Sequence, residues 1–224
     1  MTQLDPDFDR LLAATERHAW DIPRLTDREK VLLTVVADVC NQTLGSPFAQ
    51  HVAAGEKHGV YPDDFRALLR LVAFEAGYPA ALAAYDRLAE VERELGLPAT
   101  GPDGGGREAA ATAPVSPPPA AARASWHEVD SGYGEYLDLQ SGMLREMTGL
   151  SVRERAFGAI TCDVLYQTLE ETLRIHTGRA LGAGAEPDDV RAAVLFTAQF
   201  GVTRTWNAFR ALNRHLAELA DLAG

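Results

Sequence analysis

Hydrophobic residues recur along this chain at the three- and four-residue spacing of amphipathic helices. One predicted helix follows Pro62 and places on a single face Phe65, Leu68, Leu69 and Val72. An apolar run from Val31 to Cys40 predicts a second, more buried helix, which Asp38 interrupts. Apolar and polar residues do not alternate between turn signals anywhere, so strands are not expected. The pattern predicts an all-α fold.

Helix starts and ends are marked by residues with known capping chemistry. Thr26-x-x-Glu29 and Ser151-x-x-Glu154 are capping boxes, in which the hydroxyl accepts from a backbone N–H and the glutamate reaches back. Glycines at positions 77 and 201 each precede a last long helix, expected over residues 79–95 and 203–222.

The composition changes between residues 97 and 125, where glycine, proline and alanine dominate. Such a segment contains almost no large apolar side chains that could be buried, and it therefore predicts a flexible linker. It divides the chain into a first arm, residues 1–96, and a second arm, residues 126–224.

The two arms align without gaps when the register is shifted by 125 residues. Sixteen of the 51 positions from 25 to 75 are then identical, where unrelated chains of this composition share about three. The identities include Asp38 with Asp163, Gln42 with Gln167 and His51 with His176. The alignment predicts a tandem duplication whose copies pack as a pseudo-dimer.

Composition and charge argue against several classes of function. The formal net charge is −11, which disfavours nucleic acid and anionic membranes as partners. The two cysteines are too few for a disulfide scaffold or a structural zinc site. The N-terminal residues have neither the basic nor the apolar region of a signal peptide, so a cytoplasmic protein is expected.

The order of these motifs resembles the carboxymuconolactone decarboxylase and alkylhydroperoxidase D-like superfamily. The pattern is Leu-Thr/Ser-x-Arg-Glu, an apolar helix, a helix with one histidine, Pro-Asp-Asp-x-x-Arg, and a helix pair broken at glycine; it occurs in both arms. The resemblance implies an all-helical fold that assembles in rings. A tandem chain would then form a homotrimer, which is a pseudo-hexamer.

Peroxidases of this superfamily carry a Cys-x-x-Cys pair before the histidine. In this chain those positions hold Leu44 and Pro47 in the first arm, and Leu169 and Thr172 in the second. The two cysteines, Cys40 and Cys162, are not equivalent in the repeat register and are not expected to substitute as a local pair. A Cys-dependent peroxidase is therefore not expected. Decarboxylase members keep the histidine, which His51 and His176 resemble.

Each arm carries a candidate acid–base set. Asp38 and Asp163 lie inside apolar helical runs, where an unpaired carboxylate is costly. Gln42 and Gln167 follow four residues later, which predicts an amide beside each carboxylate, with His51 or His176 within reach on the next helix. Such a set suits general acid–base catalysis. The same residues could equally serve as structural ties between helices.

The second arm differs from the first in residues that could bind a substrate. With Gln167 and Gln42, the candidates for binding an anionic or aromatic molecule are Tyr166, Glu171, Trp206 and Arg204. No carboxylate or second histidine stands at metal-ligand spacing from either histidine, so no metal and no other cofactor is expected.

Two functions remain open at this point. The first is a cofactor-independent enzyme, a decarboxylase-like lyase or an isomerase, acting on a small carboxylated, lactone or polyketide-like substrate. The second is a ring-forming assembly or ligand-binding protein that has lost the chemistry of the family.

Overall fold

The computed structural model describes residues 5–99 and 120–221. No strand occurs in these two ranges, which confirms the all-α fold. The helices of the first arm are α1 (Pro6–Trp20), α2 (Asp27–Asn41), α3 (Ser46–Gly55), η1 (Glu56–His58), α4 (Pro62–Glu75) and α5 (Tyr78–Leu95). Those of the second are α6 (Ala120–Val129), α7 (Ser131–Arg145), α8 (Val152–Tyr166), α9 (Glu171–Gly182), α10 (Pro187–Phe196), η3 (Thr197–Phe200) and α11 (Val202–Asp221).

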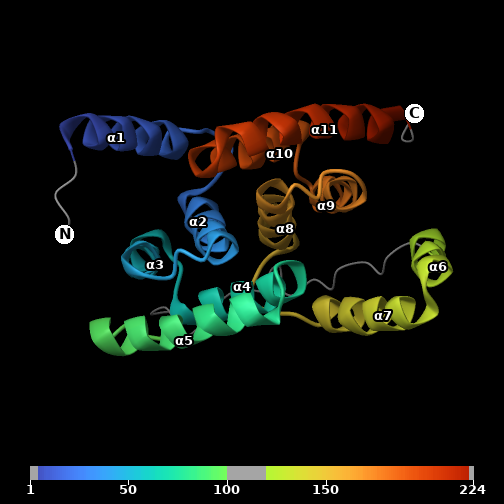
Figure 1. Cartoon of the computed structure of the whole chain (residues 1–224), viewed down its shortest axis with the longest axis horizontal. Helices are drawn as coiled ribbons and strands as arrows, with labels where there is room; N and C mark the ends of the chain where they lie inside the picture. The colour runs from blue at the N-terminus through green and yellow to red at the C-terminus, as the bar shows by residue number, and fades with distance from the viewer. Residues whose placement is uncertain (1–4, 100–119, 222–224) are drawn as a thin grey trace.

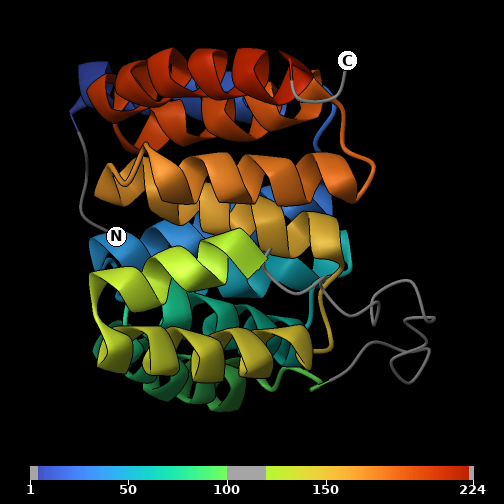
Figure 2. The same cartoon turned by 90° about the vertical axis from the view of Figure 1, so that its right-hand side faces the viewer.

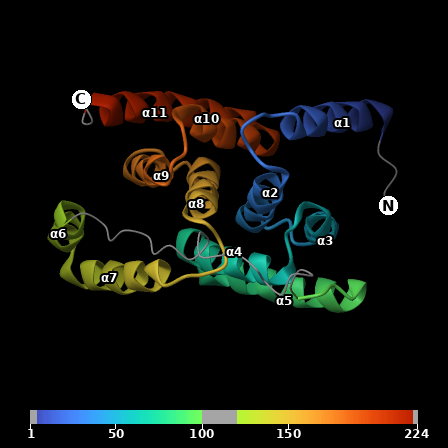
Figure 3. The same ribbon diagram turned by 180° about the vertical axis from the view of Figure 1, so that it is seen from behind.

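The helices form three layers (Figure 1). The middle layer holds α2 and α8 side by side, flanked by α3 and α9, and the view from behind gives the same order (Figure 3). One outer layer contains α4, α5 and α7, and the other contains α1, α10 and α11; the layers remain separate in the perpendicular view (Figure 2). The pair α2 and α8 is therefore the axis about which the arms meet.

Each arm contributes its early helix to the outer layer of the other arm. Ala19, Ile22 and Leu25, at and after the end of α1, belong to the hydrophobic core built mainly by α8 to α11. In the same way, Leu150 belongs to the core of the first arm, and Leu144 of α7 packs against it. Neither arm closes a core without the other, because both cores include side chains from the two arms.

The helix boundaries follow the register of the sequence alignment. The starts of α1, α2, α3 and α4 are repeated 125 residues later by α7, α8, α9 and α10. Both predicted capping boxes are confirmed, at Thr26 and at Ser151. The last helices of the two arms, α5 and α11, begin one residue before their predicted starts.

The predicted linker over 97–125 needs a correction at its end. Residues 120–125 are the first part of α6, which continues to Val129, because alanine dominates there and has the highest helix propensity. Residues 100–119 of the predicted linker lie outside the described ranges. No helix within the described ranges has the length and apolarity needed to cross a bilayer.

An arginine at the start of each central helix ties the arms together. Arg28 of α2 donates from Nε to Glu154 of α8 at 2.6 Å, and from Nη1 to Asp64 of its own arm at 3.0 Å. Asp64 also accepts from the backbone N–H of Tyr61, where α4 begins. The guanidinium therefore links α2, α4 and α8.

Arg153 makes the same contacts from the opposite side. Its Nε donates to Glu29 at 2.7 Å and its Nη1 donates to Asp189 at 2.8 Å. Under the 125-residue shift Arg153 corresponds to Arg28, Glu29 to Glu154, and Asp189 to Asp64. We call these six residues the reciprocal ion-pair network. Its members are the residues of the Arg-Glu and Pro-Asp-Asp motifs, so these motifs have a structural role.

We expect Arg28→Ala to destabilise the whole chain by about 1–3 kcal/mol, because it leaves two largely buried carboxylates without their guanidinium. Arg153→Ala should cost a similar amount. Chemical denaturation followed by circular dichroism measures both. The matched control is Arg10→Ala, since Arg10 pairs with Asp7 on the surface with 75% of its side chain exposed, and that variant should change stability by less than about 0.5 kcal/mol. Equal midpoints for the wild type and Arg28→Ala would contradict the assigned role.

Candidate functional site

Each arm brings its predicted aspartate and histidine together. In the first arm, His51 Nδ1 lies 2.6 Å from Asp38 Oδ2. In the second arm, His176 Nδ1 lies 2.7 Å from Asp163 Oδ2. The aspartates are at most 4% exposed, so the histidine ring supplies the polar partner that a buried carboxylate needs.

A turn with an unusual backbone conformation completes each pair. The helix before it ends at Asn41 or Tyr166, and the next residue, Gln42 or Gln167, has a φ value of 57° or 60° in the left-handed region. This turn directs the hydroxyl of the following threonine back to the helix. Thr43 Oγ1 donates to Asp38 Oδ1 at 2.8 Å, and Thr168 Oγ1 donates to Asp163 Oδ1 at 2.7 Å. Both oxygens of each aspartate are therefore engaged.

The expectation that glutamine lies beside each carboxylate is wrong. Gln42 Nε2 donates to the carbonyl of Val39, and Gln167 Nε2 donates to the carbonyl of Val164. Because each helix ends one residue before its glutamine, the four-residue spacing no longer places the two side chains on one face. Threonine occupies the place predicted for the amide.

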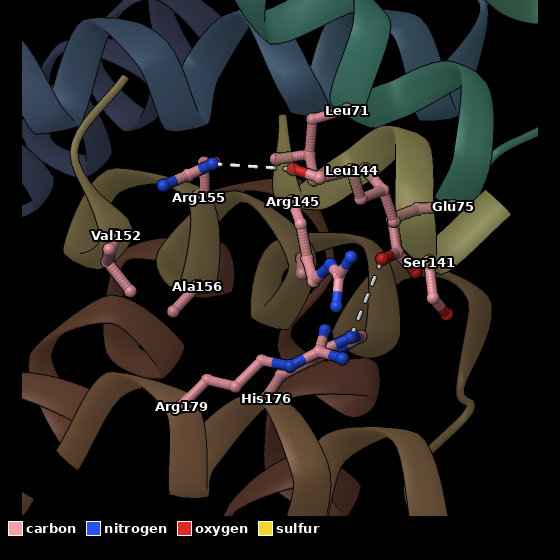
Figure 4. Close-up of a pocket in the computed structure, with 11 residues that line it drawn as sticks. Leu71, Glu75, Ser141, Leu144, Arg145, Val152, Arg155, Ala156, His176 and Arg179 are labelled. Atoms are coloured by element: carbon pink, nitrogen blue, oxygen red, sulfur yellow. Dashed lines mark hydrogen bonds and ion pairs between the residues drawn. The ribbon is translucent and has the colours of Figure 1, made fainter. Parts of the chain in front are cut away.

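A small cavity adjoins the histidine of the second arm (Figure 4). Its volume is about 40 Å³, enough for roughly three water molecules. It lies between α4 of the first arm and α7, α8 and α9 of the second. It is lined by Leu71, Glu75, Ser141, Leu144, Arg145, Val152, Arg155, Ala156, Ala159, His176 and Arg179.

Glu75 is the residue that sequence analysis missed. It is the last residue of α4, and its Oε1 lies 3.5 Å from His176 Nε2, which is too long for a good hydrogen bond. This buried oxygen has no hydrogen-bond partner. The signal was present in the sequence, because Glu75 continues the helical spacing of Phe65, Leu68 and Val72 and so lies on the buried face.

Burial and charge shift the acid–base properties of this site. Burial raises the pKa of Glu75, although the nearby charges of His176 and Arg179 oppose that change. Burial alone would lower the pKa of His176, but the carboxylates of Glu75 and Asp163 outweigh it and raise that pKa above 6.5. The pKa values of both groups at the edge of the cavity are therefore raised above their usual ranges.

Arginines surround this cavity. Burial lowers the pKa of Arg179 and of Arg155, and Arg155 donates to the carbonyl of Met147 at 3.0 Å. Figure 4 shows the guanidinium groups of Arg145 and Arg179 near the carboxylate of Glu75. The lining thus combines a histidine, a carboxyl group and three cationic side chains.

The positions that correspond to three of the cavity residues carry different side chains. Under the 125-residue shift, Glu75 corresponds to Phe200, Leu71 to Phe196 and Arg145 to Trp20. The rings of Phe196 and Phe200 contact each other edge to face, and Phe196 is fully buried. Aromatic rings thus replace the glutamate and one arginine. Both arms keep the aspartate–histidine pair, but the glutamate that lies beside His176 has a phenylalanine as its counterpart in the repeat register.

The other predicted binding residues lie outside the cavity. Tyr166 Oη donates to the carbonyl of Cys40 at 3.5 Å, and Arg204 donates to Asn41 at 3.2 Å. Glu171 pairs with Arg174 on the same helix at 2.7 Å. Trp206 is 67% exposed. With Gln42 and Gln167 at the helix ends, none of the six predicted substrate-binding residues lines this cavity.

The two cysteines are not a local pair in the sequence, but the fold brings them together. Cys40 Sγ and Cys162 Sγ lie 3.7 Å apart, although 122 residues separate them in the sequence. Packing of α2 against α8 brings them together, and local spacing cannot report such a contact. Within the described ranges, no cluster of three or more His, Cys, Asp or Glu side chains is arranged to hold a metal ion.

Comparison with protein-family models gives a match for most of the first arm. A family model of the carboxymuconolactone decarboxylase family matches residues 6–90, a range that runs from the start of α1 into α5. A search of curated proteins gives no match to the chain. The match agrees with the resemblance that the Arg-Glu, histidine and Pro-Asp-Asp motifs indicate. Residues 6–90 of the chain are therefore similar to the carboxymuconolactone decarboxylase family.

Proposed function

We propose that this protein is a cofactor-independent acid–base enzyme of the decarboxylase or isomerase type, with its active site in the cavity between α4 and α9. The family match indicates chemistry like that of carboxymuconolactone decarboxylases or alkylhydroperoxidases. The observation that carries the finer proposal is the facing pair of His176 and Glu75, which lie 3.5 Å apart beside a cavity.

His176 is the proposed proton donor and acceptor. Its Nδ1 is engaged by Asp163, so Nε2 is the ring nitrogen that can serve the cavity. Asp163 is a positioning residue in this proposal, because it fixes the ring and stabilises the imidazolium. The sequence pattern included Asp163 in the candidate acid–base set, and in this proposal Glu75 takes its place as the second proton-carrying group.

A substrate that carries a carboxylate β to a carbonyl group fits this arrangement of side chains. Arg179 and Arg145 would hold the anionic substrate. The bond between the carboxylate and the neighbouring carbon breaks, carbon dioxide leaves, and the electron pair forms an enolate. His176 stabilises the enolate oxygen by hydrogen bonding, and a proton from the His176–Glu75 pair then reaches the enolate carbon. An isomerase would use the same two groups to remove and return one proton.

The second candidate function is ligand binding or assembly without catalysis. It is favoured by the burial of both aspartates, whose oxygens are all occupied, and by the aromatic residues Phe200 and Trp20 at the positions that correspond to Glu75 and Arg145. The homotrimer stays a prediction under both functions.

We expect His176→Gln and Glu75→Gln each to lower turnover about 10²- to 10⁴-fold, the usual contribution of a general acid or base. The assay is carbon dioxide release from a panel of carboxylated lactones, including carboxymuconolactone, and β-keto acids. The matched control is His51→Gln, which removes the corresponding histidine of the first arm and should change turnover less than about threefold. Full turnover in His176→Gln would contradict the assignment. Binding of panel members with no turnover by the wild type would favour the second candidate.

The protonation of His176 provides a test that needs no substrate. Nuclear magnetic resonance titration should give His176 a pKa above 6.5, and Glu75→Gln should lower that pKa because the largest charge that raises it is lost. Since the pKa is raised on folding, its stabilising contribution is complete below pH 6.5 and falls as pH rises through the folded value. In Glu75→Gln this fall should begin at lower pH.

The control for this titration is Glu171→Gln, which alters an exposed carboxylate on the same helix. It should leave the titration of His176 unchanged. If Glu75→Gln left the His176 titration unchanged as well, the two groups would not interact as proposed.

A further inference from the structure

The two cysteines meet where the arms meet. Cys40 lies in the last turn of α2 and Cys162 lies in α8, and these helices run side by side in the middle layer (Figures 1 and 3). Their sulfur atoms are 3.7 Å apart. Cys162 is 2% exposed, whereas Cys40 is partly exposed. One thiol can therefore be reached from solvent, and the other can be reached through its neighbour.

Packing alone does not explain sulfur at this contact. Under the 125-residue shift, Cys40 corresponds to Leu165 and Cys162 to Ala37. Leu165 and Ala37 are both buried, so leucine and alanine fill the positions that correspond to the two cysteines. The paired thiols occur on one side of the pseudo-symmetric seam only.

The surroundings make the two thiols unequal. The hydrogen bond between the two sulfur atoms lowers the pKa of Cys40; burial opposes this change, while Tyr166 and the charge of Arg204 assist it. The same sulfur contact, together with burial, raises the pKa of Cys162. Cys40 is thus the better nucleophile, and Cys162 is the group that reacts second.

We propose that Cys40 and Cys162 form a reversible disulfide that joins α2 to α8, and thereby the two arms. A disulfide requires an S–S distance of about 2.05 Å, so the sulfurs must approach by roughly 1.7 Å, a shift of the size that rotation about a Cα–Cβ bond produces. This inference does not depend on the proposed function, since it concerns thiols that do not line the cavity.

The exchange with a small disulfide such as oxidised glutathione balances in two steps. The Cys40 thiolate attacks one glutathione sulfur, the S–S bond of glutathione breaks, and one glutathione thiolate leaves. Cys162 then loses its proton, attacks Cys40 Sγ and displaces the second glutathione. The two protein thiols are oxidised, and one molecule of glutathione disulfide is reduced to two thiols.

The experiment exposes the full native chain to a series of ratios of oxidised to reduced glutathione, traps remaining thiols by alkylation, and identifies peptides by mass spectrometry. Both thiols should disappear together and yield one peptide pair that joins Cys40 to Cys162. The melting temperature should rise by about 5–15 °C, because the bond closes a long loop. The rise in melting temperature should be lost when the disulfide is reduced.

Two variants separate the roles of the thiols. Cys162→Ser should stop at a mixed disulfide between Cys40 and glutathione, whereas Cys40→Ser should leave Cys162 unmodified in the native chain. The control is the urea-unfolded chain, in which both thiols should react because both are exposed. The proposal is overturned if both thiols stay free in the native chain at ratios that oxidise the unfolded chain, or if the native chain forms only disulfides between molecules.

Discussion

Two guanidinium groups, each shared between the arms, determine how the rest of this molecule is arranged. Arg28 and Arg153 each bridge a carboxylate at the start of the opposite central helix and a carboxylate at the start of a helix in their own arm. Carboxylates with little exposure are stable only when such a partner is present. Because the contacts are reciprocal, the network fixes α2 against α8 in one register. The exchanged helices α1 and α7 then complete the two cores.

The register of the central helices also creates the candidate site. It places the end of α4 opposite α9, so a glutamate of the first arm faces a histidine of the second. The scaffold is nearly symmetric, but the side chains are not, since the place of Glu75 is taken by Phe200 on the other side. The glutamate that lies beside His176 therefore has no carboxylate counterpart in the repeat register. The thiol pair is a second feature found on one side of the seam alone.

The sequence predicted those features that depend on neighbours along the chain. Helix starts, capping boxes and the register between the arms are local signals, and the approach of His51 to Asp38 and of His176 to Asp163 follows from one helix packing on the next. The glutamines were misplaced because a single residue in a left-handed conformation ends the helix early. Glu75, the three cavity arginines and the cysteine contact depend on packing between segments far apart in sequence, which periodicity does not report. The pattern on α4 could still have singled out Glu75 as buried.

The central claim is that the reciprocal ion-pair network and the shared cores make the two arms one cooperative unit. Native-state hydrogen exchange of the full chain, followed by mass spectrometry over a range of low denaturant concentrations, tests it most directly. The amides of α2 and α8 should exchange with the same opening free energy, equal to that of global unfolding, and Arg28→Ala should lower both values together. Exchange of α8 through an opening that leaves α2 protected would contradict the account.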